Sequence, residues 1–272
     1  MERWRIEEPQ SLDLEGVRRL HVRLVAGGID VVGSAENADS RAARVEITDL
    51  AGPLNVELAD GTLTITHERL TWGGLFDWVG GDRASAVLSV SVPPDCPVEL
   101  GVVSANAVVS GIAADRTAVK SVSGGITLDG VRSDISAKTV SGDLETRRLA
   151  GTLAFTTVSG DLTVVAGSSG SVRAETVSGD LILDLDLQTG GRINVSSVSG
   201  DVTVRMPGSV GLRVDVKSMS GSLSSAFDGV NEERRPGVAR MRGQIGDGSG
   251  SFSAKTVSGD IVLLQRADQG DA

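Results

Sequence analysis

Five aspartates occupy the same place in a repeated phrase and are the best candidates in the sequence for metal or ion chemistry. Each directly follows Ser-Gly, and they are Asp143, Asp161, Asp180, Asp201 and Asp260. If equivalent residues stack in neighbouring coils, these carboxylates lie about 5 Å apart and repel one another unless something offsets their charge. We expect backbone N–H groups of the turns to bind the carboxylates, and calcium held between coils is the alternative. The nine-residue Gly-Gly-x-Gly-x-Asp repeat of calcium-binding β-rolls is not matched, and Gly125 and Ser222 interrupt the column.

An aromatic segment, residues 70–81, is the best candidate for binding a partner. Trp72, Phe76 and Trp78 lie in it and make up three of the seven aromatic residues of the chain. Such side chains are costly to expose, so the segment is expected to pack as a lid over an open end of the fold. The alternative is contact with a protein, a glycan or a membrane surface, because large rigid rings are favoured at interfaces.

Residues arranged for catalysis are not evident in the sequence. His21 and His67 are far apart and have no metal-ligand spacing, and Cys96 has no neighbouring base that would activate its thiol. A polysaccharide-cleaving β-helix would need acids and a base clustered on one outer sheet. The exposed position before each repeated Ser or Thr is mixed instead, reading Lys120, Lys138, Thr156, Glu175, Ser196, Lys217 and Lys255. We therefore expect no enzymatic activity and no cofactor, with the polysaccharide-acting enzyme as the remaining alternative.

Charge and composition narrow the classes of partner. The 272 residues carry a formal net charge of −10, and we see no basic stripe of the kind that nucleic-acid binding requires. No apolar run is long enough to span a bilayer, and the N-terminus does not resemble a signal peptide. We expect a cytoplasmic protein that binds no nucleic acid and does not span a membrane, with association to the cell envelope through a partner as the alternative.

A repeated phrase indicates the elements that position these residues. Val or Met followed by Ser-Gly occurs seven times, with the serines at 123, 141, 159, 178, 199, 220 and 258. Apolar residues alternate with polar ones before and after each copy, which is typical of strands with one buried face. A unit this short cannot bury its own apolar face, so neighbouring copies must stack. The sequence predicts an all-β fold, a parallel β-solenoid of 18–21-residue coils, and an antiparallel sandwich is the rival.

The regularity of the repeat changes along the chain. Residues 1–100 predict an irregular β region that caps the solenoid, with strands at 21–25, 44–48, 62–66 and 86–92 and a hairpin turn at Asp60-Gly61. Residues 101–265 predict the solenoid itself. Within it, residues 224–251 form an insertion expected to contain a polar loop and one hairpin, and residues 266–272 form a tail.

The motifs also resemble a known family. The Thr-Val-Ser-Gly-Asp-Leu copies, Val-Pro-Pro at 92–94 and Gly-Asp-Gly-Ser-Gly-Ser-Phe at 246–252 are similar to a bacterial β-strand-repeat family of unknown function labelled "putative adhesin". The resemblance covers roughly residues 15–265 and implies a β-solenoid-like domain with no established catalytic residues. We therefore expect a non-catalytic structural or interaction protein that presents a repetitive surface to a protein, a glycan or a second copy of itself. A self-assembling scaffold is the alternative.

Overall fold

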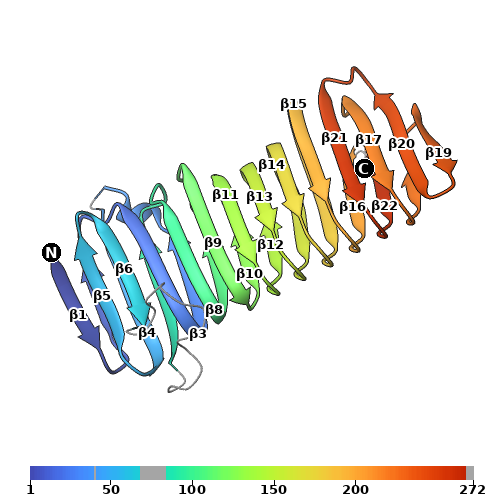
Figure 1. Ribbon diagram of the computed structural model, residues 1–272. Coiled ribbons are helices and arrows are strands. Elements are labelled where there is room, and N and C mark those ends of the chain that lie inside the picture. The colour runs from blue at the N-terminus through green and yellow to red at the C-terminus, as the bar shows by residue number, and fades with distance from the viewer. Residues whose placement is uncertain (40, 68–83, 268–272) are drawn as a thin grey trace. The chain divides into compact units, whose positions relative to one another are not determined.

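The computed structural model describes residues 1–39, 41–67 and 84–267 (Figure 1). The chain divides into two compact units, unit 1 (Met1–Asp134) and unit 2 (Ile135–Ala272). In these described ranges, the regular elements of both units are strands, apart from one short 3-10 turn, Ala35–Asn37. The expected all-β class is confirmed. The aromatic segment 70–81 lies outside the described residues.

Unit 1 combines antiparallel hairpins with long strands that pair in parallel. Its strands are β1 (Glu2–Ile6), β2 (Ser11–Leu14), β3 (Arg19–Gly33), β4 (Ala43–Ala51), β5 (Leu54–Ala59), β6 (Thr62–His67), β7 (Ser85–Val92), β8 (Val98–Ser110), β9 (Arg116–Ser123) and β10 (Ile126–Asp129). β3 pairs in parallel with β6, β7 and β8, and β8 pairs in parallel with β9 and β10. β8 crosses residue 100, and parallel pairing already begins at β3, inside the region that the sequence sets apart as irregular.

The outer strands of unit 1 are antiparallel, unlike those of a uniform parallel coil. β1 pairs with β5, β5 with β6, β2 with β4 and β4 with β7, all antiparallel. The predicted hairpin at Asp60-Gly61 joins β5 to β6, and both turn residues have positive φ, 50° and 74°. Two consecutive positive φ values match the right-handed twist of the strands they connect. Unit 1 therefore mixes antiparallel hairpins with parallel pairs.

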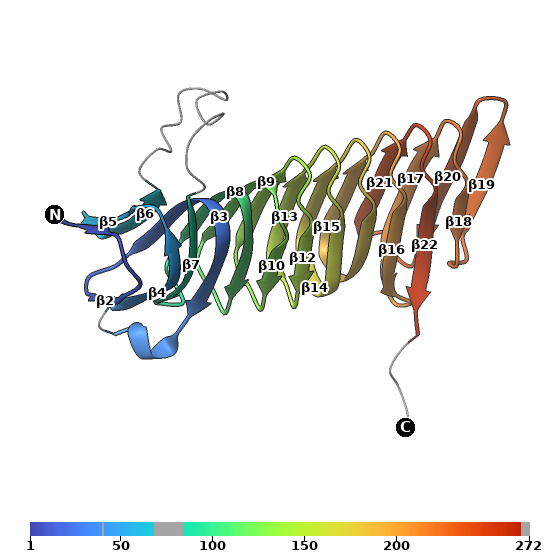
Figure 2. The same ribbon diagram turned by 90° about the horizontal axis from the view of Figure 1, so that it is seen from below.

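Unit 2 contains the stacked repeats. Its strands are β11 (Asp134–Thr139, which starts at the unit boundary), β12 (Leu144–Arg147), β13 (Ala150–Thr156), β14 (Leu162–Glu175), β15 (Leu181–Ser196), β16 (Val202–Pro207), β17 (Leu212–Ser218), β18 (Leu223–Ser225), β19 (Val230–Arg235), β20 (Val238–Ile245), β21 (Gly250–Thr256) and β22 (Ile261–Arg266). Each copy is strand, turn, strand, and Figure 2 shows how successive turns repeat along the unit. β14 and β15 bend, so their two halves pair with different strands.

Equivalent apolar residues of the copies stand in register across this stack. One column runs, in spatial order, Ile135, Leu153, Val172, Ile193, Phe252 and Val214, and a second runs Leu144, Leu162, Leu181, Val202, Ile261 and Leu223. All twelve side chains are buried. The predicted parallel, in-register stacking is confirmed for the copies of unit 2, and these columns form their shared core.

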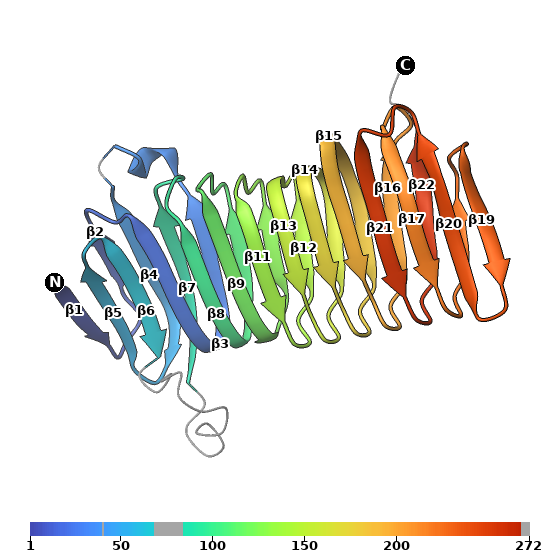
Figure 3. The same ribbon diagram turned by 45° about the horizontal axis from the view of Figure 1, so that its top comes forward.

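The order of the copies in space differs from their order in the sequence. β21 pairs in parallel with both β15 and β17, and β22 pairs with both β16 and β18. The last copy of the chain therefore lies between the two copies that precede it, as Figures 1 and 3 show. The expectation that neighbours in sequence are neighbours in the stack is wrong at this end.

The hairpin of β19 and β20 explains the long final interval of the repeat. β20 pairs antiparallel with β17 on one side and with β19 on the other. The chain then crosses β17 through residues 246–249 to enter the stack as β21 on the opposite side of β17. Gly211 lies under this crossing, where a Cβ atom would stand 1.8 Å from the Asp247 carboxylate oxygen. The loop of the Gly-Asp-Gly-Ser-Gly-Ser-Phe motif thus passes over a position where a side chain would have to displace those of Asp247 and Ser249.

The Ser-Gly turn has a steric cause. A Cβ atom added to Gly160, Gly179, Gly200, Gly221 or Gly259 would stand between 1.8 and 2.1 Å from the glycine carbonyl oxygen of the neighbouring turn. Only glycine permits the backbones to approach this closely.

A buried Ser or Thr stands two residues before the serine of each of these Ser-Gly turns. Its hydroxyl accepts a hydrogen bond from the glycine N–H of the same turn, as Thr176 does from Gly179 at 2.8 Å. Some hydroxyls of this column also bond to a neighbouring copy: Thr139 pairs with Thr157 at 2.8 Å, and Ser218 donates to the Gly259 carbonyl at 3.2 Å.

Candidate functional site

The five turn aspartates are brought together as one column in unit 2. In each case Oδ1 accepts a hydrogen bond from the backbone N–H of the equivalent residue in the next turn. The pairs are Asp143 with Asp161, Asp161 with Asp180, Asp180 with Asp201, Asp201 with Asp260, and Asp260 with Ser222, at 2.7 to 2.9 Å. Hydrogen bonds to backbone donors, the first of the two expectations, therefore engage every carboxylate of the column.

The chemistry of this column is that of a hydrogen-bond ladder. Among the described residues, no group of three or more His, Cys, Asp or Glu side chains is arranged to hold a metal ion. The Ser222 N–H bound to Asp260 lowers the pKa of that carboxyl below its ordinary value of 3.8, because the bond favours the charged form. At Asp260, the donated hydrogen bond thus stabilises the ionised carboxylate.

Next to the ladder, an apolar ridge runs along the same turns. It consists of the Val or Met that precedes each Ser-Gly of unit 2, in spatial order Val140, Val158, Val177, Val198, Val257 and Met219. Each of these residues is between 45% and 59% exposed. Neighbouring turns are hydrogen-bonded, for example Ser178 N–H to the Val158 carbonyl at 3.0 Å, so the ridge is continuous and about 24 Å long.

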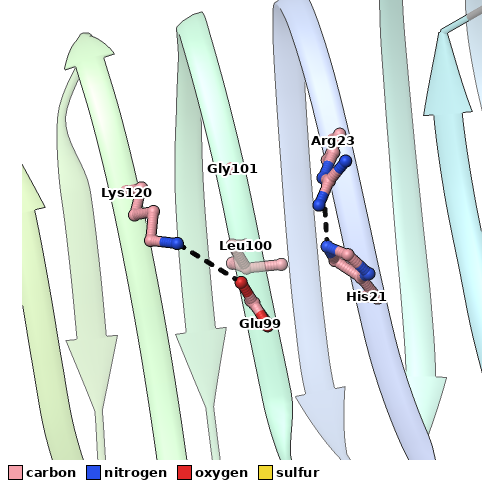
Figure 4. A pocket seen from close by; sticks show the side chains of 6 residues that line it. All are labelled: His21, Arg23, Glu99, Leu100, Gly101 and Lys120. Atoms are coloured by element: carbon pink, nitrogen blue, oxygen red, sulfur yellow. Dashed lines mark hydrogen bonds and ion pairs between the residues drawn. The ribbon is translucent and has the colours of Figure 1, made fainter. Parts of the chain in front are cut away.

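Unit 1 carries a shallow hollow on the outer face of one sheet (Figure 4). It has a volume of about 340 Å³ and is lined by His21, Arg23, Glu99, Leu100, Gly101 and Lys120. Gly101 stands in register between Arg23 and Lys120, so the layer of side chains is interrupted there. Arg23 Nε donates to His21 Nε2 at 3.1 Å, and Lys120 lies 3.5 Å from Glu99. Partial burial, assisted by Arg23, lowers the pKa of His21.

A second hollow lies in unit 2, over β17, β19 and β20. We call it the basic hollow, and its lining comprises Lys217, Glu233, Arg235, Val238, Arg240 and Arg242 around a volume of about 460 Å³. Asp215 holds both arginines of β20, at 3.1 Å from Arg240 Nη2 and 3.2 Å from Arg242 Nε. Four cations thus surround one shallow space in a chain whose net charge is −10.

The remaining candidates from the sequence are the three aromatic residues of segment 70–81 and Cys96. Trp72, Phe76 and Trp78 lie outside the described residues. Cys96 is fully buried, and burial raises the pKa of its thiol to about 11. It behaves as the small apolar residue that the sequence indicates.

Sequence reasoning did not identify the apolar ridge or the basic hollow. The exposed Val could have been detected as the odd residue in the period-two pattern of each copy. Arg240 and Arg242 gave no such signal, because they belong to a hairpin outside the repeat and reach Lys217 only through antiparallel pairing.

Stacked, in-register copies joined by tight turns define a β-solenoid-like repeat protein. The model of the Toastrack DUF4097 family matches residues 27–264, and the chain belongs to this family. The resemblance drawn from the motifs is thereby confirmed. Among curated proteins, none matches the chain. Among the described residues, no helix is long and apolar enough to cross a membrane.

Solved structures with similar folds share little sequence with the chain. A putative adhesin from Bacteroides fragilis is 9% identical with a TM-score of 0.50, and the match covers 95% of this chain and 98% of that one. A putative adhesin from Parabacteroides distasonis is 13% identical with a TM-score of 0.48, covering 94% and 97%. A putative lipid binding protein from the same organism is 12% identical with a TM-score of 0.45, covering 94% and 96%. At 9% identity, the likeness to the Bacteroides fragilis protein concerns the fold alone.

Proposed function

We propose that the protein is a non-catalytic binding module, a β-solenoid whose repeated turns in unit 2 present the apolar ridge to a partner protein. The observation that supports this proposal is the ridge itself, six half-exposed apolar side chains in one column. Contiguous exposed apolar surface is uncommon on soluble proteins and marks interaction sites more often than isolated apolar residues do.

The ridge suits a protein partner better than a glycan. Its side chains are aliphatic and evenly spaced by the stacking of the turns, so they offer complementary packing to apolar side chains of another protein. The serine hydroxyl that follows a ridge residue bonds within the stack, as Ser199 Oγ does with the Val177 carbonyl at 3.2 Å, and Oδ1 of each turn carboxylate accepts a backbone N–H. Burying the ridge against a partner therefore removes apolar area from water with few polar groups to desolvate.

The two alternative functions fit the described residues less well. End-to-end assembly needs an open strand edge, yet β19, an edge strand of unit 2, carries Glu232, Glu233, Arg234 and Arg235 in succession. Charged edge strands resist pairing with another chain. A polysaccharide-acting enzyme needs carboxylates that are available to substrate, whereas those of the turn column each accept a backbone hydrogen bond.

The proposal is tested by changing the ridge without changing the fold. A variant with Val158→Lys, Val177→Lys and Val198→Lys is compared with a control carrying Val32→Lys, Val87→Lys and Val108→Lys, three exposed valines of unit 1. A partner isolated from the native host is purified and titrated against both variants by calorimetry. We expect the ridge variant to bind at least about tenfold more weakly and the control to bind like the wild type. Unchanged affinity of the ridge variant would contradict the proposal.

A further inference from the structure

The basic hollow brings like charges into direct opposition. Lys217 of β17 is in register with Lys255 of β21 on one side and with Arg240 of β20 on the other. Like charges directly opposite each other on neighbouring strands destabilise a sheet. Such a breach of a local stability rule is expected at functional sites.

Carboxylates nearby offset only part of this charge. Asp215 pairs with Arg240 and Arg242, and Glu233 lies 3.6 Å from Arg235. Among the described residues, Lys217 and Lys255 have no carboxylate within ion-pair distance. The hollow and Lys255 together carry five cations and two carboxylates, an excess of three positive charges.

The side chains are also held in a suitable geometry. Asp215 accepts from Nε and Nη2 of Arg240 and from Nε of Arg242, so it fixes two guanidinium groups on the same face of β20. Guanidinium groups bind planar or tetrahedral oxyanions through paired N–H donors, while lysine contributes a mobile point charge. The hollow therefore has both kinds of donor for an oxyanion.

Size and charge indicate the class of anion. About two phosphate groups, each carrying a charge of about −1.5 to −2, balance the excess of three positive charges. Carboxylates carry one charge each, so three of them would have to be crowded into the same space. The volume of about 460 Å³ is that of a small-molecule site. A long polyanion would meet the acidic remainder of the chain, which repels it. We infer that the basic hollow binds a small soluble compound that carries two or more phosphate groups.

Inorganic pyrophosphate is the probe for this site, titrated by calorimetry into the full chain at low ionic strength. We expect saturable binding of one pyrophosphate per chain. In the double variant Lys217→Gln and Lys255→Gln the affinity should fall at least about tenfold. Its melting temperature without ligand should not decrease, because the substitutions relieve repulsion and break no ion pair. The single variant Arg235→Gln, on the exposed strand β19, should also weaken binding.

The control carries the same change of charge on the same sheet face outside the hollow. It combines Lys138→Gln with Arg192→Gln, and its affinity for pyrophosphate should stay within about twofold of the wild type. No saturable binding to the wild type would overturn the inference. An equal loss in the control would overturn it too, because binding would then follow net charge alone. Equally tight binding of citrate would overturn the assignment to phosphate chemistry.

Discussion

Asp201 Oδ1 accepts a hydrogen bond of 2.8 Å from the backbone N–H of Asp260, although 59 residues separate the two in sequence. The next turn of the column, at Ser222, then bonds to Asp260 and not to Asp201. The last copy of the repeat is therefore an internal layer of unit 2. Its removal should affect the stack on both sides, unlike the loss of a terminal coil in a sequential solenoid.

A chain ending at residue 249 lacks β21 and β22 and should lose cooperative folding in unit 2. β15 and β17, and likewise β16 and β18, would lose the strand that lies between them, and β17 would keep only β20 as a partner. Hydrogen exchange should show amides of β17 and β18 unprotected. A chain ending at residue 267, which keeps every described strand, serves as the control and should exchange like the wild type. Retained protection of β17 in the shorter chain would show that the last copy is dispensable.

Gly200→Ala should destabilise unit 2 by about 1–3 kcal/mol, since the new Cβ must be accommodated 1.9 Å from the Gly179 carbonyl oxygen by moving backbone. Urea unfolding followed by circular dichroism measures the change. Gly28→Ala is the matched control, because the nearest atom to its Cβ is 4.0 Å away and its φ is not positive. A stability of Gly200→Ala equal to that of the wild type would mean that the turns are not packed as closely as described.

Asp180→Ala should lower the free energy of unfolding by about 1 kcal/mol, because the Asp201 N–H loses its acceptor at 2.9 Å. Asp180→Asn should be close to neutral, since the amide oxygen replaces the carboxylate oxygen. Unit 1 already contains this arrangement, in which Asn106 Oδ1 accepts from the Gly125 N–H at 2.9 Å. Thermal unfolding of the two variants makes the comparison. If Asp180→Asn loses as much stability as Asp180→Ala, the negative charge of the carboxylate matters.

The same measurement with calcium or a chelator separates the ladder from a metal site. If hydrogen bonds alone hold the carboxylates, the melting temperature should be the same with either addition. A rise with calcium that is absent in Asp180→Asn would instead support ions between coils.

Stability should fall as the pH decreases below about 6.5, the ordinary pKa of histidine. Burial lowers the pKa of His67, whose Nδ1 accepts from the Val25 N–H at 3.1 Å, and it also lowers the pKa of His21. Below about pH 6.5 the unfolded chain therefore binds more protons at these histidines than the folded chain does. The stability that the neutral histidines contribute is fully present above about pH 6.5, and it is lost as the pH falls toward their pKa values in the folded chain. Urea unfolding between about pH 7 and pH 5 measures the slope. His67→Gln should reduce it, and adding His21→Gln should reduce it further, whereas an unchanged slope in the double variant would assign it to other groups.

The sequence by itself determined the repeat, the buried columns and the turn chemistry. Alternating apolar residues define one buried face locally, and a glycine such as Gly200 is required wherever two turns approach closely, so both leave a periodic signal. Copies with the same pattern can stack on one another, which was sufficient to predict the stacking that places Leu153 in register with Val172.

Only the tertiary structure decided which copy lies beside which. The carboxylate of Asp201 can accept the same hydrogen bond from the turn N–H of any other copy. The local pattern therefore cannot distinguish Ser222 from Asp260 as the neighbour of Asp201, although the structure pairs Asp201 with Asp260.

The order of the copies in the stack depends on the hairpin of β19 and β20, which reverses the chain before it crosses β17. It also depends on Gly211, whose missing side chain leaves space for that crossing. The same pairing sets Arg240 beside Lys217, so the basic hollow exists only in the folded chain. A side-chain periodicity is a local property, whereas the choice among equivalent partners is made by the path of the whole chain.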